Sequence, residues 1–201
     1  MEFLPIRVNG DKVYAGFLRR FGSMLIDFII LLIINYSLYF FDSISFSLTI
    51  LISVFSVIFF SIYTIYFHYK YGATLGKIVF GIKVTLPNGE AIRLKQAVLR
   101  SSVDIFFSIL FLMATVNAMN GIDYEHYVTL AWEERNTYTL LLLPAWYIMV
   151  SSFEQVWIWS ELLVLLFNKR KRAIHDFIAG TVVIKKEYAI EPDTRGILAS
   201  N

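Results

Sequence analysis

The 201-residue chain contains no cysteine, four prolines and three histidines. Without cysteine it cannot form disulfides, use a catalytic thiolate or hold a cysteine-ligated zinc or iron–sulfur cluster. The sequence also lacks the catalytic and phosphate-binding motifs HExxH, GxSxG, GxGxxG and GxxxxGK[ST]. An enzyme is therefore the least favoured class, and we expect no catalytic residue, no cofactor and no dedicated metal site.

Charge is almost absent from four long stretches of a chain that is 57% apolar, with a mean hydropathy of +0.61. Each stretch can cross a hydrocarbon core of about 30 Å as a helix. Pro144 sets the start of the last stretch, because proline cannot continue a helical hydrogen-bond ladder. We predict an all-α polytopic membrane protein, a single membrane domain over residues 1–201, with transmembrane helices at about 21–41, 46–67, 101–119 and 145–167.

Lysine and arginine lie almost wholly on one side of these predicted spans. Of 18 cations, only Arg135 falls in the loop 120–144, which also holds several acidic residues. Because cationic side chains are retained in the cytoplasm, both termini and the loop 68–100 are predicted to be cytoplasmic and 120–144 to be the outer loop.

The cytoplasmic loop 68–100 is too short to bury a core of its own and should lie against the membrane. Residues 78–84 are apolar and rich in β-branched side chains, and Pro87, Asn88 and Gly89 form a turn signal. We expect residues 91–94 to return as a second strand. The loop is therefore predicted to form a small juxtamembrane β-hairpin layer.

A weak internal repeat relates residues 74–84 to residues 173–183. Gly81 aligns with Gly180 and Val84 with Val183, and each segment follows the end of a predicted helical pair. Lys77 falls opposite Asp176. The repeat therefore predicts a charge pair across a pseudo-symmetry axis.

Several carboxylates fall inside the predicted spans. At about 1.5 Å of rise per residue, Asp27 lies about 10 Å and Glu161 about 9 Å inward of the cytoplasmic boundary. Glu154 lies farther out on the same helix face as Glu161. Such groups cost several kcal/mol in lipid unless they are paired, hydrated or neutral. We therefore regard Asp27, Glu154 and Glu161 as candidate sites for a cation or proton, with His175 as a candidate relay.

The cations near these carboxylates suggest ion pairs. Arg20 and Asp27 share a helix face but differ by about 10.5 Å in rise, so Asp27 should take a partner from a neighbouring element. Arg100 and Asp104 are four residues apart and can pair within one helix. The residues assigned to structural ion pairs are Arg19, Lys77, Arg100 and Asp104.

A basic run at 169–172 follows the last predicted span. At this position it favours a topology anchor and a contact with lipid phosphates over a nucleic-acid site. His175 and Asp176 come directly after it. An imidazole beside a carboxylate could relay protons, and a capping aspartate explains the pair equally well.

Three segments together resemble the RDD family of prokaryotic membrane proteins, named for one arginine and two aspartates. They are YAGFLRRFGSMLIDFIILL, GATLGKIVFGIKVTLPNGEAIRLKQAVLR and NKRKRAIHDFIAGTVVIKK. The resemblance implies Asp27 and Asp176 as the motif aspartates, with Arg20 the better match for the motif arginine and Arg19 the alternative. It also implies a multi-pass protein of the prokaryotic cytoplasmic membrane and a broad association with transport, without a substrate.

Two functional hypotheses follow. The first is a cation or proton-coupled transporter, which explains carboxylates kept at depth in the membrane. The second is a membrane scaffold or assembly partner whose charges lock the helices together. Four spans joined by short loops leave little room for a substrate pathway within a single chain, so we expect a homo-oligomer in the lipid bilayer.

Overall fold

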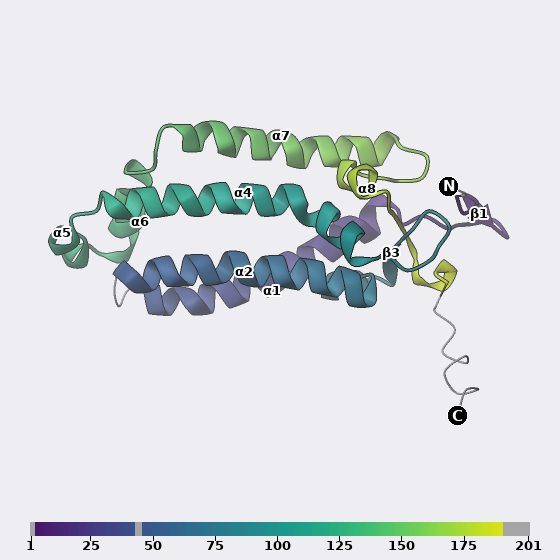
Figure 1. The fold of residues 1–201 in the computed structure, drawn as a ribbon, viewed down its shortest axis with the longest axis horizontal. Coiled ribbons are helices and arrows are strands. Elements are labelled where there is room, and N and C mark those ends of the chain that lie inside the picture. Colours follow the sequence, from purple (N-terminus) through teal and green to yellow (C-terminus); the bar gives the residue numbers. More distant parts are fainter. Residues whose placement is uncertain (1–2, 43–45, 191–201) are drawn as a thin grey trace, which may run out of the picture. The chain divides into compact units, whose positions relative to one another are not determined.

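The computed structural model describes residues 3–42 and 46–190 (Figure 1). Its long helices, which cover the four apolar stretches, are α1 (Phe17–Asp42), α2 (Phe46–Tyr71), α4 (Leu94–Asn120) and α7 (Trp146–Phe167). Within the described residues, three helical segments are long and apolar enough to cross a membrane: Leu48–Val79, Leu94–Asn120 and Trp146–Phe167. The protein is therefore mostly helical, with several candidate membrane-spanning helices.

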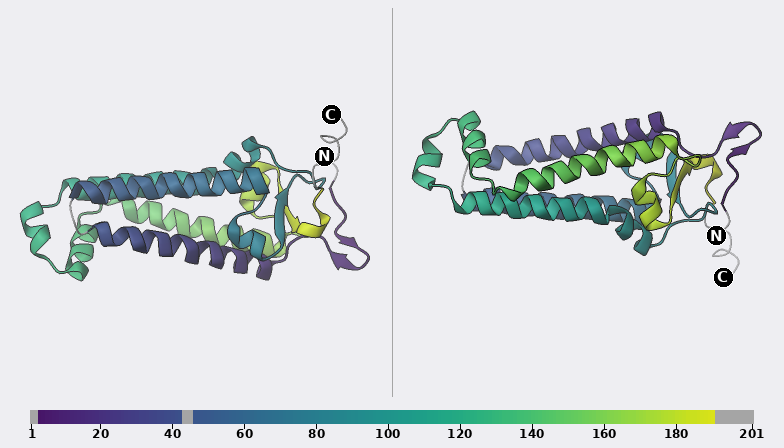
Figure 2. Two further views of the ribbon diagram at one scale, coloured as in Figure 1. Left: turned by 90° about the horizontal axis from the view of Figure 1, so that it is seen from below. Right: turned by 90° about the horizontal axis from the view of Figure 1, so that it is seen from above.

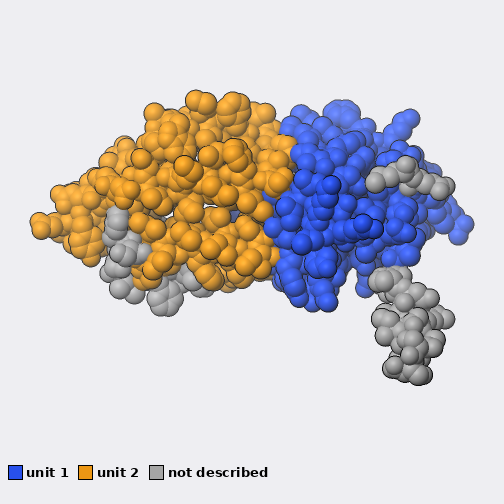
Figure 3. All heavy atoms as spheres, in the orientation of Figure 1, with its two compact units in different colours: residues 1–28, 63–101, 160–201 blue, residues 29–62, 102–159 orange. Residues whose placement is uncertain are grey.

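The chain divides into two compact units (Figure 3). Unit 1 comprises Met1–Phe28, Tyr63–Ser101 and Ser160–Asn201, and unit 2 comprises Ile29–Ile62 and Ser102–Trp159. Besides parts of the long helices, unit 1 holds the short elements β1 (Arg7–Val8), β2 (Asp11–Lys12), α3 (Leu75–Val79), β3 (Ile82–Thr85), α8 (Ile174–Ala179), β4 (Val182–Lys185) and η1 (Lys186–Tyr188). Unit 2 holds α5 (Tyr124–Thr129) and α6 (Trp132–Leu141).

In unit 2, Arg135 ties α5 to α6. Its guanidinium donates to the carbonyl oxygens of Leu130 and Val128 at 3.0 Å each, at the end of α5. A cation suits this position because the last carbonyls of a helix are unsatisfied and carry partial negative charge. This local role accounts for an arginine in a loop that is otherwise poor in cations.

In unit 1, β3 pairs with β4 in an antiparallel sheet (Figure 2, teal beside yellow). The predicted hairpin between 78–84 and 91–94 is therefore wrong. Residues 78 and 79 belong to α3, and the return segment makes only an isolated bridge between Thr85 and Ala91 among the described residues. The apolar β4 sequence VVIK buries three of its residues fully, whereas among residues 91–94 only Ile92 is buried. Pairing with β4 therefore removes more apolar surface from water.

The N-terminal segment adds to this sheet. The amide of Ala15 donates to the carbonyl of Val183 at 2.9 Å, and the amide of Lys185 donates to that of Val13 at 3.0 Å. Val13, Val183 and Ile184 are each at most 1% exposed. Three segments from distant parts of the sequence thus build two small buried clusters, one with Ala15 and Val183 and the other with Val13 and Ile184.

The structure gives the predicted repeat a physical form. In each copy a glycine with positive φ lies between a short helix and a strand, with φ of 61° at Gly81 and 67° at Gly180. Glycine adopts this left-handed conformation without the penalty of a Cβ. Val84 lies opposite Val183 in the sheet, and these residues are also equivalent in the repeat. The two copies are therefore related by a local twofold axis through this pair.

A close backbone contact at Gly76 yields the first prediction. A Cβ at Gly76 would collide with the carbonyl oxygen of Ser23 and lie 2.9 Å from Cγ of Asp27. Gly76→Ala should therefore push α3 away from α1 and cost about 1 to 3 kcal/mol, as overpacking does. Thermal unfolding in detergent measures this cost.

Gly16→Ala is the matched control, since a Cβ at Gly16 meets no atom within 4 Å. It should unfold close to the wild-type temperature. Equal unfolding temperatures for the Gly76 and Gly16 variants would contradict the close contact.

Candidate functional site

The centre of unit 1 is the carboxylate of Asp176, in the first turn of α8. Its Oδ2 accepts hydrogen bonds from Nη1 and Nη2 of Arg20, both at 2.8 Å, and Oδ1 accepts from Nη1 of Arg100. The Asp176 side chain is 0% exposed, against 10% for Arg20 and 5% for Arg100. One buried carboxylate thus joins α1, α4 and α8.

Further hydrogen bonds involve the carboxylate of Asp176 and the backbone around it. Its Oδ2 also accepts from the amide of Ala173 at 2.9 Å, which caps the first turn of α8. Arg172 donates to the carbonyl oxygens of Asp176 and Thr181 at 3.0 Å each. Asp176 is therefore a capping aspartate and an ion-pair partner at once, a combination that the sequence left open.

Electrostatics keeps Asp176 ionised. Burial opposes its charged form, but the guanidinium groups of Arg100 and Arg20 outweigh burial and hold the pKa of Asp176 well below its usual range. The carboxylate is therefore negative at neutral pH and contributes an attractive charge to both arginines.

His175 links Arg100 to Glu161 of α7. Nη2 of Arg100 lies 2.6 Å from Nε2 of His175, and Nδ1 of His175 is paired with Glu161. Because a guanidinium can only donate, this geometry assigns Nε2 as an acceptor and places the imidazole proton on Nδ1, facing Glu161. The backbone amide of His175 donates to Glu161 as well, at 2.6 Å.

These contacts form one connected group. It contains two guanidinium groups, Arg20 and Arg100, two carboxyl groups, Asp176 and Glu161, and the imidazole of His175. A buried group of charges is tolerated when each member is paired and hydrogen-bonded. We name this set, Arg20, Arg100, Glu161, His175 and Asp176, the arginine–aspartate network.

Asp27 lies outside this network and is held by neutral donors. Its carboxylate accepts from the hydroxyl of Tyr63 at 2.7 Å, from that of Thr74 at 2.5 Å and from the amide of Gly76 at 2.8 Å. The expectation that Asp27 takes its partners from neighbouring elements is therefore confirmed. These partners are neutral, and the cations Arg20 and Arg100 bind Asp176. Asp27 instead fixes the first turn of α3 against α1 and α2.

Other predicted ion pairs also differ in the structure. Nζ of Lys77 donates to Thr74 at 3.3 Å and forms no ion pair with Asp176 or another described residue. Arg19 is exposed and likewise has no ion pair within the described ranges. Asp104 accepts from Nε1 of Trp157 at 3.2 Å, while Arg100 binds Asp176 instead of its helical neighbour. Arg100 therefore binds the buried carboxylate of Asp176, which α8 holds in place, in preference to the nearby Asp104.

Glu154 is separate from all of these contacts. It lies in unit 2, is partly buried, and has no hydrogen-bond or ion-pair partner among the described residues. Trp157 is three residues away, so Glu154 and the Trp157 contact with Asp104 lie on one side of α7.

The described residues contain no group of three or more His, Asp or Glu that could hold a metal ion.

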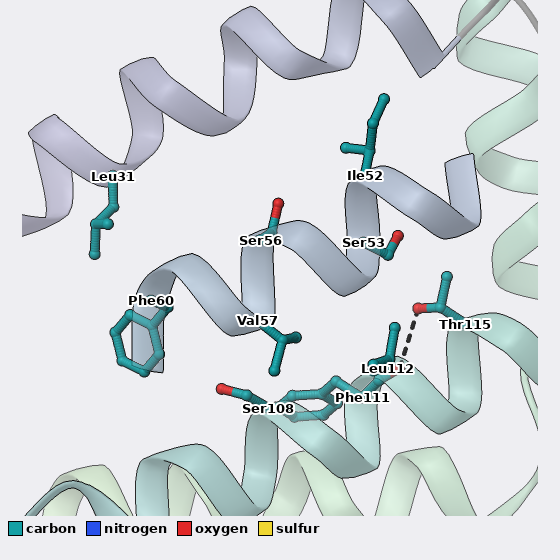
Figure 4. A pocket seen from close by; sticks show the side chains of 10 residues that line it. All are labelled: Leu31, Ile52, Ser53, Ser56, Val57, Phe60, Ser108, Phe111, Leu112 and Thr115. Atoms are coloured by element: carbon teal, nitrogen blue, oxygen red, sulfur yellow. Dashed lines mark hydrogen bonds between the residues drawn. The ribbon is translucent and has the colours of Figure 1, made fainter. Parts of the chain in front are cut away.

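Unit 2 also contains an open hollow of about 490 Å³ between α1, α2 and α4 (Figure 4). Its lining is apolar except for hydroxyls, among them Ser53, Ser56, Ser108 and Thr115. Ser108 donates to the carbonyl of Asp104 at 2.8 Å and Thr115 to that of Phe111 at 3.0 Å. The hydroxyl protons of Ser108 and Thr115 are therefore engaged in these hydrogen bonds, and their oxygen atoms can still accept hydrogen bonds.

The sequence matches the model of the RDD family over residues 14–180, so the chain belongs to the RDD family. No curated protein and no solved structure matches it. With its long apolar helices, the chain is an integral, multi-pass membrane protein. Of the two arginines that could fill the motif position, Arg20 is the one that contacts Asp176.

The arginine–aspartate network predicts an acid-dependent stability. Because the pKa of Asp176 is depressed in the folded state, its contribution is present above the unfolded value of about 3.9 and is lost as pH falls through the folded value. Asp176→Asn should cost about 3 to 5 kcal/mol at pH 7, since it leaves two buried arginines unpaired. It should also flatten the loss of stability below about pH 5.

Unfolding in detergent between pH 7 and pH 3 measures both effects, with Asp11→Asn, an exposed aspartate of β2, as control. The control should follow the wild-type curve. Parallel pH curves for wild type and Asp176→Asn would exclude the assigned role.

Proposed function

We propose that the chain is a four-span protein of the prokaryotic cytoplasmic membrane, with both termini in the cytoplasm, that carries a small cation or a proton. The placement of the cations and the apolar sequence of α1 support the topology. The observation that carries the function is Glu154, a carboxylate in the middle of a membrane helix with no protein partner among the described residues.

Glu154 has the properties that ion exchange requires. A carboxylate in a membrane helix is costly unless it meets a cation, a proton or water, so an unpaired one favours a transported ion as its partner. Asp104 approaches the same side of α7 through Trp157. Two carboxylates in one region favour a shared proton or a bound cation, because they repel each other when both are charged.

The remaining acidic groups serve a different role in this proposal. Asp27, Glu161 and Asp176 already accept hydrogen bonds from the protein itself. A transported ion would have to displace these donors and loosen α3 or α8. These groups therefore hold unit 1 together, and the proposal includes no enzymatic reaction.

A scaffold or assembly partner is the second candidate. The closed arginine–aspartate network favours it, because a purely structural lock needs no exchange with water. One side of α7 also presents large apolar groups, with Phe153 61%, Val156 64% and Trp159 60% exposed. Lipid or a second copy of the chain would cover them, and either function is compatible with a homo-oligomer.

The topology can be tested because the chain contains no cysteine. Glu125→Cys, in the exposed part of α5, should react with an impermeant thiol reagent in intact cells, because the loop 120–144 is expected outside. Glu90→Cys, exposed in the loop between α2 and α4, should react only after permeabilisation. The reverse pattern would overturn the proposed orientation.

Transport is tested by Glu154→Gln, which preserves size and removes the charge. In proteoliposomes with a fluorescent readout of H⁺, Na⁺ or K⁺ flux, the variant should lose at least 90% of wild-type flux, about a tenfold effect that corresponds to 1.4 kcal/mol. Elution volume and unfolding temperature should not change.

Glu187→Gln is the matched control, because the Glu187 side chain is 61% exposed. It should retain wild-type flux. If wild-type flux of all three ions equals that of empty liposomes and Glu154→Gln alters subunit association, the carrier proposal fails and the scaffold stands.

A further inference from the structure

A second hollow, of about 440 Å³, lies in unit 1 where α7 ends. Its walls come from the β1–β2 hairpin, residues 14 and 16, and the segment 167–171. Four of its lining residues are cationic: Arg7, Lys12, Lys169 and Lys171. None of the four forms an ion pair with another described residue, so the hollow carries uncompensated positive charge.

The hairpin that supplies two of these cations is a specific structure. Asn9 and Gly10 both have positive φ, 51° and 89°, which is the turn that joins two-residue hairpins. Lys12 pairs across it with Arg7. The neighbouring acid, Asp11, points to the opposite side of the strand, because successive side chains alternate.

The basic run after α7 divides into two sets. Arg170 lies over the ring of Phe3 at 4.1 Å and Arg172 over that of Phe177 at 4.1 Å, so both turn toward the protein. Oδ1 of Asn168 accepts from the amides of Arg170 and Arg172, which bends the chain. The other two residues, Lys169 and Lys171, line the hollow. Nζ of Lys171 also donates one hydrogen bond to the carbonyl oxygen of Leu166 at 2.8 Å, and an ammonium group has two further protons to donate.

Apolar groups complete the hollow. Phe167, the last residue of α7, is 86% exposed, and Ile6 is 43% exposed. A site with several cations beside a bare aromatic ring at the end of a membrane helix suits a ligand with an anionic head and an apolar tail. A free anion would use the cations only and would leave Phe167 in water.

We propose that this hollow binds the headgroup of an anionic phospholipid, with the phosphate held by Arg7, Lys12, Lys169 and Lys171 and the acyl chains lying along Phe167. This site goes beyond the proposed function and does not depend on transport. It would couple the N-terminal hairpin, which supplies Arg7 and Lys12, to the bilayer.

The test uses the full chain, delipidated in detergent. Native mass spectrometry and unfolding temperature are measured with phosphatidylglycerol, with phosphatidylcholine and with sn-glycerol 3-phosphate. Phosphatidylglycerol should bind and raise the unfolding temperature, and the other two should not. The double variant Lys12→Gln, Lys169→Gln should weaken phosphatidylglycerol binding about tenfold or more.

Lys70→Gln with Lys95→Gln is the control, because it removes the same charge from exposed positions elsewhere in unit 1. It should bind phosphatidylglycerol as the wild type does. If both double variants weaken phosphatidylglycerol binding equally, the binding depends on net charge alone, and the proposed site is overturned. A response to sn-glycerol 3-phosphate equal to that of the lipid would identify a free phosphate ligand and overturn the lipid assignment.

Discussion

A fully buried carboxylate between two guanidinium groups is the constraint on which unit 1 depends. Asp176 is stable at 0% exposure because Arg20 and Arg100 meet it there, one from α1 and one from α4. Their positions fix α8, and α8 fixes β4 through the turn at Gly180. β4 in turn pairs with β3 and with residues 13–15. The arginine–aspartate network thus determines where three distant parts of the chain meet.

Carboxylates from long helices hold both copies of the repeat in the same manner. Gly76 and His175 are equivalent residues, and their amides donate to Asp27 and to Glu161, at 2.8 Å and 2.6 Å. Each short helix is therefore held at its first turn by an acid from a long helix. The three residues that the resemblance assigns to the motif make different contacts, since Arg20 and Asp176 pair with each other while Asp27 binds neutral donors.

The sequence predicts those features that depend on local pattern. Long apolar runs predict the four long helices, and the similarity of 74–84 to 173–183 predicts two matching helix–strand copies. Partners far apart in the chain are not predictable in this way. Arg20 and Asp176 are 156 residues apart, and Arg100 prefers that buried acceptor to Asp104 in its own helix. The dipeptide Asn9–Gly10 is a local signal for the β1–β2 hairpin. Composition and hydropathy alone do not detect it.

The most direct measurement is a double-mutant cycle between Arg20 and Asp176. The variants Arg20→Gln and Asp176→Asn are unfolded in detergent singly and together, so that the cycle isolates the interaction of the two side chains. The account predicts a coupling energy of about 1.5 to 3 kcal/mol, as for a charge-assisted hydrogen bond in a buried pair. A coupling energy near zero would contradict it, because Asp176 would then not be the group through which Arg20 stabilises unit 1.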